Sequence, residues 1–120
     1  MSRGQQVKSR SRLVDLAVSY FKKEGYKVNS EKVMLEGHSG VTRHFDLIVQ
    51  KGRLEQGVWV RDWNRTIGVN VIINLDTSCE DVDLSSPIMI GAKFSDHAKS
   101  YSNRRKITLL TKQKMTTSFR

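Results

Sequence analysis

Two apolar segments, FDLIVQ at residues 45–50 and VWVRDW at residues 58–63, decide the fold of this chain. Both are rich in branched and aromatic side chains, a composition typical of buried strands. The stretch between them, KGRLEQG at residues 51–57, predicts a hairpin-type connection. Together the three stretches predict two successive strands joined by a hairpin.

On the N-terminal side, apolar residues recur at the spacing of one helix face: Leu13, Leu16, Ala17, Tyr20 and Phe21. This spacing predicts an amphipathic helix that Ser9 or Ser11 caps and that Gly25 ends in the left-handed conformation. A turn over residues 26–30 and a strand over residues 32–36 follow, and the glycines after that strand break it.

On the C-terminal side, residues 66–75 are ambiguous because their β-branched side chains suit a strand while their spacing also suits a helix. Val69, Ile72 and Ile73 fit the helical period. We favour a helix because the next segment, PIMIGA at residues 87–92, returns to a strand.

The last third of the chain predicts a short helix and a short strand. Ser95 has the side chain of a helix cap, and Phe94, Ala98 and Tyr101 supply the apolar residues. ITLL at residues 107–110 predicts the final strand, and residues 111–120 a polar, basic tail. The order of elements is therefore α–β–β–β–α–β–α–β in one domain.

Composition excludes several classes of protein. With 120 residues, 38% of them hydrophobic and 28% charged, the chain is neither a polar disordered tail nor a membrane protein. No apolar run approaches the ~18 residues that span a bilayer, and the start lacks a hydrophobic signal core. Cys79 is the single cysteine, which excludes an intramolecular disulfide and a thiolate metal cage. We therefore expect a reducing, cytoplasmic setting.

The net charge of +9 favours a polyanionic partner, most often nucleic acid. The first twelve residues are basic without an acid, and no acidic side chain follows Asp96. The acids instead collect in one stretch: Asp76, Glu80, Asp81 and Asp83. This asymmetry predicts a basic face and an acidic surface loop.

Several motifs in this order resemble the PD-(D/E)xK nuclease superfamily, most of all its Mrr-like restriction endonuclease and archaeal Holliday-junction resolvase branches. They are EGYKV at residues 24–28, HFDLIV at 44–49, DWNRTIG at 62–68 and FSDHA at 94–98. The resemblance implies a restriction-endonuclease-like α/β fold, a central mixed sheet of four to five strands flanked by helices. It also implies a homodimer, since members of the superfamily commonly dimerise.

The resemblance divides the chain into three parts. We expect a basic N-terminal arm over residues 1–12, the nuclease-like domain over residues 10–111 and a basic tail over residues 112–120.

Nucleases of this superfamily hydrolyse a phosphodiester with Mg²⁺, which needs hard oxygen ligands such as paired carboxylates. In the family one acid lies on the strand that matches FDLIV, and a Glu and a Lys lie two residues apart on the next strand. By this resemblance Asp46 is the first acid, while Trp59 stands at the Glu position and Arg61 at the Lys position.

Both departures affect the chemistry. Trp59 cannot ligate a hard metal, and Arg61 stays protonated, so it suits a phosphate more than an attacking water. Asp62 would replace the missing Glu only if a bulge turned it to the same face, and Glu36 offers a carboxylate from the end of its strand. The catalytic and metal positions are thus Asp46 and Arg61, with Glu36 and Asp62 as further ligands only in an active enzyme.

Three hypotheses remain open. The first is a DNA-binding protein, for duplex or branched DNA, that has lost catalysis and needs no cofactor. The second is an active Mg²⁺-dependent endonuclease or junction resolvase with an unorthodox acid pair. The third is a subunit that binds another protein, for which the apolar side chains of residues 66–75 would serve. The candidate DNA contacts are Lys8, Arg10, Arg12, Arg43, Arg61, Arg65, Lys93, Arg104, Arg105 and Lys106.

Overall fold

Five strands in the order β1–β2–β3–β5–β7 form the central sheet of the structure, a computed structural model that describes residues 11–120. A separate pair joins β4 to β6. In chain order the elements are α1 (Arg12–Lys23), β1 (Lys27–Glu36), β2 (Thr42–Lys51), β3 (Leu54–Val60), β4 (Thr66–Ile67), α2 (Val69–Asp81), β5 (Ser85–Gly91), β6 (Lys93–Phe94), α3 (Asp96–Arg105), β7 (Thr108–Thr111) and α4 (Lys112–Thr117). The predicted succession of elements is present, with β4, β6 and α4 in addition.

The sheet is mixed because its two halves are connected differently. β1, β2 and β3 follow one another through hairpins and pair antiparallel. β3, β5 and β7 run parallel, and such neighbours need crossover connections, which α2 and α3 supply. This mixed five-stranded sheet confirms the predicted fold class.

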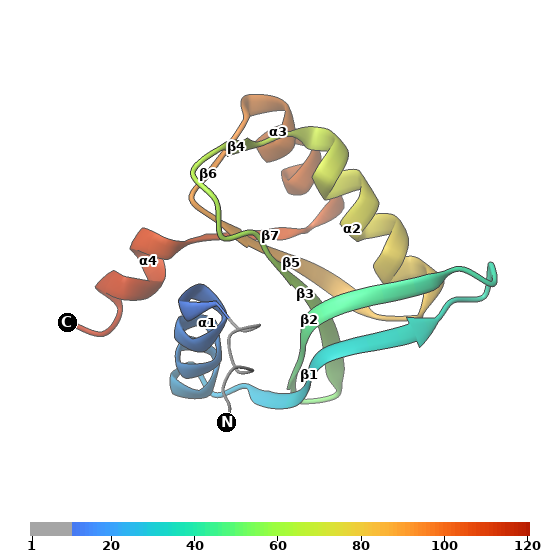
Figure 1. The fold of residues 1–120 in the computed structure, drawn as a ribbon, viewed down its shortest axis with the longest axis horizontal. Coiled ribbons are helices and arrows are strands. Elements are labelled where there is room, and N and C mark those ends of the chain that lie inside the picture. Colours follow the sequence, from blue (N-terminus) through green and yellow to red (C-terminus); the bar gives the residue numbers. More distant parts are fainter. Residues whose placement is uncertain (1–10) are drawn as a thin grey trace, which may run out of the picture.

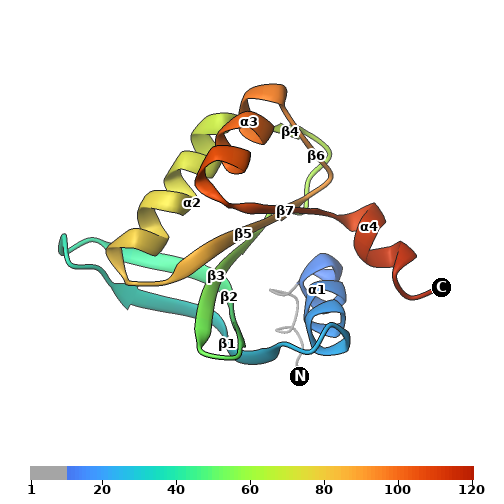
Figure 2. The same ribbon diagram turned by 180° about the vertical axis from the view of Figure 1, so that it is seen from behind.

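Helices cover both faces of the sheet, with α2 and α3 on one face and α1 and α4 on the other (Figures 1 and 2). Successive side chains of the central strands point to opposite faces of the sheet. Val58 and Ile88 pack in the cluster that contains α1, whereas Ile48 and Met89 pack in the cluster that contains α2 and α3. Within residues 11–120, no helix has the length and apolar character needed to cross a bilayer.

Local signals set the helix ends as predicted. The Ser11 hydroxyl accepts a hydrogen bond from the backbone N–H of Val14 at 3.1 Å, which caps α1. Gly25 follows α1 with a φ of +90°, a conformation that glycine adopts without steric cost. The Ser95 hydroxyl likewise caps α3 by accepting from Ala98 N–H at 3.1 Å.

The boundaries of β1 and β3 differ most from the prediction. β1 begins at Lys27 rather than after a turn over residues 26–30, because Lys27 pairs with Gln50 across the sheet. β3 begins at Leu54 and ends at Val60, so the connection to β2 is tight and residues 61–63 lie beyond the strand. Pairing with neighbouring strands sets the ends of both β1 and β3. The spacing of apolar residues along the sequence does not show this pairing.

The acidic stretch is not a surface loop, and that prediction is wrong. Its first three acids belong to α2, where Leu75 and Cys79 continue the buried face of the helix. A Cβ built on Gly57 of β3 would lie 2.7 Å from Cys79 Sγ, so α2 packs directly on the backbone of the sheet. Burial also raises the pKa of the Cys79 thiol to about 12, so the thiol stays protonated at neutral pH.

The C-terminal segment is also more ordered than predicted. Lys112–Thr117 form α4, and Met115 is fully buried in the cluster with α1. Lys23 of α1 donates a hydrogen bond to the backbone oxygen of Ser118. A single buried methionine in a polar sequence is a weak signal, which is why the sequence predicts a tail here.

Candidate functional site

Asp46 lies just beyond the last backbone pair of β2 and β3, where side chains connect the two strands instead. The backbone pairing runs from Lys51 opposite Leu54 to Leu47 opposite Val58. Beyond it, the Asp46 carboxylate accepts a hydrogen bond from Val60 N–H at 2.7 Å. These contacts let the two strands separate without leaving a backbone donor unpaired.

Trp59 makes the matching contact from the other strand. Its indole Nε1 donates a hydrogen bond to the backbone oxygen of His44 at 2.7 Å. The side chain at the family's Glu position therefore bridges β3 to β2 and holds the strands in their separated arrangement.

The alternation of β2 also breaks at Asp46. Phe45 and Ile48 both pack in the cluster that contains α2, although strict alternation would place them on opposite faces. Lys32 lies opposite Asp46, between the paired residues of β1 and β2, and has a φ of +51°. Such an irregularity turns a side chain away from its regular direction, here toward the gap between β2 and β3.

A cavity of about 320 Å³ opens at this point. Its lining residues are Thr42, Arg43, His44, Asp46, Trp59, Arg61 and Ser78. Thr42, His44 and Asp46 alternate along β2, while Ser78 comes from the buried side of α2. The cavity thus lies between two strands and a helix, at the position that the resemblance assigns to the nuclease site.

Arg61 stacks on the aromatic rings around it. Its guanidinium carbon lies 4.6 Å from the centre of the Trp59 ring and 5.8 Å from that of Trp63. Arg65 extends the stack, with its guanidinium carbon 4.2 Å from the centre of the Trp63 ring. Arg61 Nη1 donates to the backbone oxygen of Val60 at 3.4 Å, and stacking by the faces leaves the remaining N–H groups at the edge of the guanidinium available for a phosphate.

Arg61 also lies beside the carboxylate of Asp46, with 3.9 Å between Nη1 and Oδ2. Burial lowers the pKa of the Arg61 guanidinium, and the negative charge of Asp46 opposes that shift. An arginine remains protonated at neutral pH in either case, so the site pairs one fixed positive charge with one negative charge.

The side chains around Asp46 do not fit a hydrated Mg²⁺ ion. Such an ion takes hard oxygen ligands in octahedral geometry, usually from at least one or two carboxylates. Here the single carboxylate accepts a hydrogen bond from Val60 and faces a cation, and the neighbouring family position is an indole. Among residues 11–120, no three His, Cys, Asp or Glu side chains come together as a metal site.

Neither of the two further acids lines the cavity with Asp46. Glu36 pairs with Thr42, which is four residues from Asp46 and therefore roughly 13 Å along β2 at the usual strand rise. Asp62 is exposed and follows β3, which ends at Val60, so strand alternation no longer fixes its direction.

Comparison with solved structures shows what this architecture is similar to. A crystal structure of a protein of unknown function, AF1548, matches with a TM-score of 0.75 at 15% identity, over 84% of this chain and 58% of that one. A structure of an EndoMS–dsDNA2 complex matches with a TM-score of 0.60 at 10% identity, over 91% of this chain and 48% of that one. The chain therefore spans about half the length of these structures. No protein-family model and no curated protein matches it.

The chain shares a nuclease-like fold with these structures.

Within this nuclease-like fold, two of the predicted DNA contacts are committed to acids of α2. Arg43 donates from Nε to the Asp81 carboxylate at 2.9 Å, and Ser39 donates to the same carboxylate from both its backbone N–H and its hydroxyl. Arg105 donates from Nε to Asp76 at 2.8 Å. The acids of α2 therefore neutralise part of the basic charge and fasten α2 to its neighbours.

The other predicted contacts lie on several elements. Arg65 follows β3, Lys93 begins β6, Arg12 begins α1, and Arg104 and Lys106 lie at the end of α3; all five are exposed. Lys8 and Arg10 lie outside the described residues. Of the candidates within residues 11–120, only Arg43, Asp46 and Arg61 line the cavity between β2 and β3.

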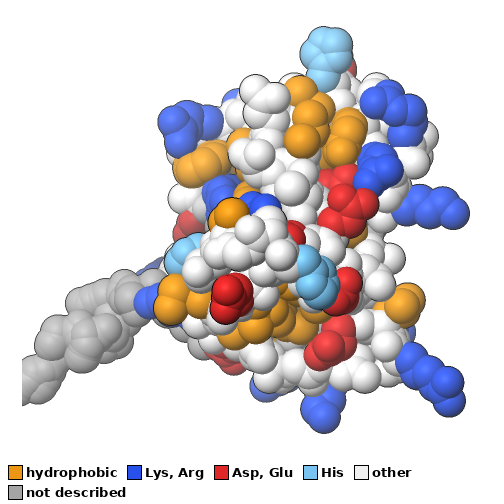
Figure 3. All heavy atoms as spheres, turned by 90° about the vertical axis from the view of Figure 1, so that its right-hand side faces the viewer, with side chains coloured by type: hydrophobic (Ala, Val, Ile, Leu, Met, Phe, Trp, Pro, Cys, Tyr) orange, Lys and Arg blue, Asp and Glu red, His pale blue; other side chains and the backbone are white. Residues whose placement is uncertain are grey.

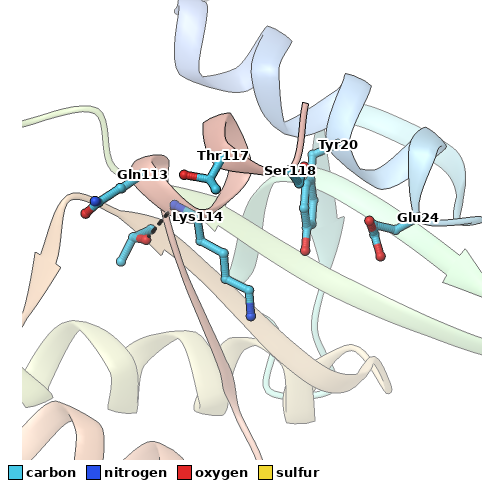
Figure 4. A pocket seen from close by; sticks show the side chains of 7 residues that line it. Tyr20, Glu24, Gln113, Lys114, Thr117 and Ser118 are labelled. Carbon is cyan, nitrogen blue, oxygen red and sulfur yellow. Dashed lines mark hydrogen bonds between the residues drawn. The ribbon is translucent and has the colours of Figure 1, made fainter. Parts of the chain in front are cut away.

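A larger hollow of about 640 Å³ lies between α1 and α4 (Figure 4). Tyr20 comes to it from α1, Glu24 from the residue directly after α1, and Lys114 and Thr117 from α4. It contains none of the candidate site residues, and its mixture of one acid, one base and hydroxyl groups indicates no single ligand.

Sequence reasoning missed three residues of the cavity. Thr42 and His44 share the two-residue period of Asp46, so strand alternation would have placed them beside it. Ser78 offers no such signal, because only the packing of α2 on the sheet brings it there.

Proposed function

We propose that this chain is a DNA-binding protein of the Mrr-like or archaeal Holliday-junction resolvase-like branch. Its site at the nuclease position contacts the phosphates of DNA and does not cleave them. The observation that carries this proposal is the pairing of Arg61 with Asp46 at 3.9 Å, on the position where the family uses a lysine beside a metal ligand. A guanidinium stacked on Trp59 offers a phosphate two N–H donors in a fixed plane.

Two further facts support DNA as the partner. The chain carries a net charge of +9, and no acidic side chain follows Asp96. The EndoMS structure, which shares the fold at 10% identity, is a complex with dsDNA. Phosphate contacts of this kind position a duplex or branched backbone without reading its sequence.

The proposal predicts strongly salt-dependent binding. We expect fluorescence anisotropy with a labelled 20-base-pair duplex and a four-way junction to show binding that weakens about a thousandfold between 50 and 200 mM NaCl, as for roughly six phosphate contacts. Arg65→Ala should reduce the slope of log affinity against log salt by about 1. Affinity that is indifferent to salt would contradict the proposal.

Metal dependence separates this function from an active endonuclease. Binding should be equal in EDTA and in Mg²⁺ at matched ionic strength, and neither Mg²⁺ nor Mn²⁺ should support cleavage of duplex, single-stranded or four-way substrates. Cleavage that disappears in Asp46→Ala would instead show an active nuclease with an unorthodox acid pair. Sedimentation of the same samples tests the predicted homodimer.

A further inference from the structure

The three parallel strands of the sheet end at one level. Arg61 N–H donates to the backbone oxygen of Ile90 at 2.8 Å, which places the residue after β3 beside the end of β5. Gly91 at the end of β5 pairs with Thr111 at the end of β7. The residues that follow these strands therefore emerge from the same edge of the sheet, the edge that commonly binds ligands in parallel sheets.

Basic residues follow each of these strand ends. Arg61 comes after β3, and Lys112 comes directly after β7. Between them, Lys93 of β6 pairs with Thr66 of β4, which brings the preceding residue, Arg65, to the same place. Figure 1 shows β4, β6 and α4 together on one side of the molecule.

A hollow of about 400 Å³ continues this surface along α4. Its lining residues are Ala92, Lys112, Gln113, Thr116, Thr117 and Arg120, none of which is acidic. Ala92 precedes Lys93, so the hollow adjoins β6. Every polar side chain of this lining can donate a hydrogen bond, which suits an anionic oxygen.

We refer to Arg61, Arg65, Lys93, Lys112 and Arg120 as the basic edge. Asp62, which follows Arg61, is exposed and opposes part of its charge. The opposite end of the molecule, where the β1–β2 hairpin projects, differs in character: Figure 3 shows acidic and histidine side chains near the middle of that face and most Lys and Arg toward its rim. There His38 contacts Asp83 at 2.7 Å.

The spacing of the basic edge suits a nucleic-acid backbone. β3 and β7 are separated by β5, so Arg61 and Lys112 start about 10 Å apart at the usual strand spacing. One DNA strand carries a phosphate about every 3.4 Å along the helix axis. The two side chains thus start far enough apart to contact different phosphates of one strand.

We propose that the DNA backbone runs across the basic edge, from Arg61 beside the cavity to Lys112 and Arg120 in the hollow of α4. This inference rests on the proposed function and adds the path of the DNA backbone over the protein surface. It assigns a binding role to α4, a segment that the sequence predicts as a polar, basic tail.

Charge reversal at matched positions tests this path. Lys112→Glu with Arg120→Glu alters the basic edge, while Lys27→Glu with Arg53→Glu alters exposed residues near the β2–β3 turn, at the other end of β3. Each pair lowers the net charge from +9 to +5, since each substitution exchanges a positive for a negative charge. Circular dichroism and thermal unfolding verify that both variants fold, and Lys112→Gln with Arg120→Gln provides a milder version.

The anisotropy assay with the 20-base-pair duplex at 100 mM NaCl gives the readout. We expect the edge variant to bind at least tenfold more weakly with a salt slope lower by about 2, and the control to stay within about threefold of the wild type. Equal losses in both variants, or none in the edge variant, overturn the path while leaving DNA binding intact. Failure of the wild type to bind the duplex overturns the proposed function itself, and tighter binding of a single-stranded RNA of equal length overturns DNA as the partner.

Discussion

The carboxylate of Asp46 accepts a hydrogen bond from Val60 N–H and lies beside Arg61, so its contacts in this chain are structural. An aspartate at this point of β2 indicates metal binding only when a second acid lies nearby. Trp59 stands at the position where the resemblance expects that second acid. The identity of one neighbour therefore changes what the same carboxylate can do.

Removal of this carboxylate should destabilise the fold. Asp46→Ala leaves the Val60 N–H without its acceptor, and we expect a loss of about 1–2 kcal/mol in the free energy of unfolding. Asp46→Asn should lose less, because the amide oxygen still accepts the hydrogen bond. Urea unfolding measures both. An Asp46→Ala variant as stable as the wild type would show that the contact contributes nothing.

A second carboxylate, Asp81, fastens the β1–β2 hairpin to α2. Hydrogen bonds from Ser39 and Arg43 hold the pKa of Asp81 at about 2, below the value of 3.8 for a free aspartate. A Cβ at Gly37 would collide with this carboxylate, so a larger residue there would have to displace Asp81 from its hydrogen bonds.

The direction of this shift predicts how stability depends on pH. Because the folded-state pKa is lowered, the contribution of Asp81 is fully present above about pH 4 and is lost as the pH falls toward 2. The difference in stability between the wild type and Asp81→Asn should therefore stay constant from pH 7 to about pH 4.5 and then shrink. Urea unfolding over this pH series checks it; a difference that grows on acidification has the wrong sign.

At the scale of elements, helix caps and apolar periods could be read from the sequence. Ser11 and Ser95 cap their helices because a hydroxyl at that position satisfies a backbone N–H locally. The limits of β1 and β3 could not be read, since they depend on partners in other strands. The continuation of α2 into its acids also depends on distant partners, namely Arg43 and Arg105.

The helix α4 gives a direct test at this scale. Met115 is fully buried, so Met115→Ala should lower the free energy of unfolding by about 2–5 kcal/mol. Gln113 lies exposed on the same helix, and Gln113→Ala should change it by no more than about 0.5 kcal/mol. Thermal or urea unfolding compares the two variants. Equal, small effects would mean that residues 112–117 behave as the polar tail that the sequence predicts.

At the scale of the whole molecule, the excess of positive charge opposes the compact state. Two ion pairs, Arg43 with Asp81 and Arg105 with Asp76, neutralise part of it on α2, and the basic edge gathers five further cations at one edge of the sheet. A chain with a net charge of +9 repels itself, and salt screens that repulsion.

We therefore expect salt to stabilise the protein at neutral pH. Between 20 and 200 mM NaCl the Tm should rise by about 2–5 °C, which corresponds to roughly 1 kcal/mol for a chain of this size. Differential scanning calorimetry measures the shift. A fall in Tm over the same range would show that attraction within the ion pairs outweighs the general repulsion.

The succession of strands and helices, the basic character of the chain and the residues at positions 59 and 61 can all be read along the sequence, because apolar period, caps and residue identity are local properties. Which charges remain available is instead a property of the tertiary structure. It pairs Arg43 and Arg105 with acids of α2, sets Arg61 against Asp46, and brings Lys112 and Arg120 to the ends of the parallel strands. These outcomes depend on contacts between residues far apart in the chain, and no pattern along the sequence reports such contacts.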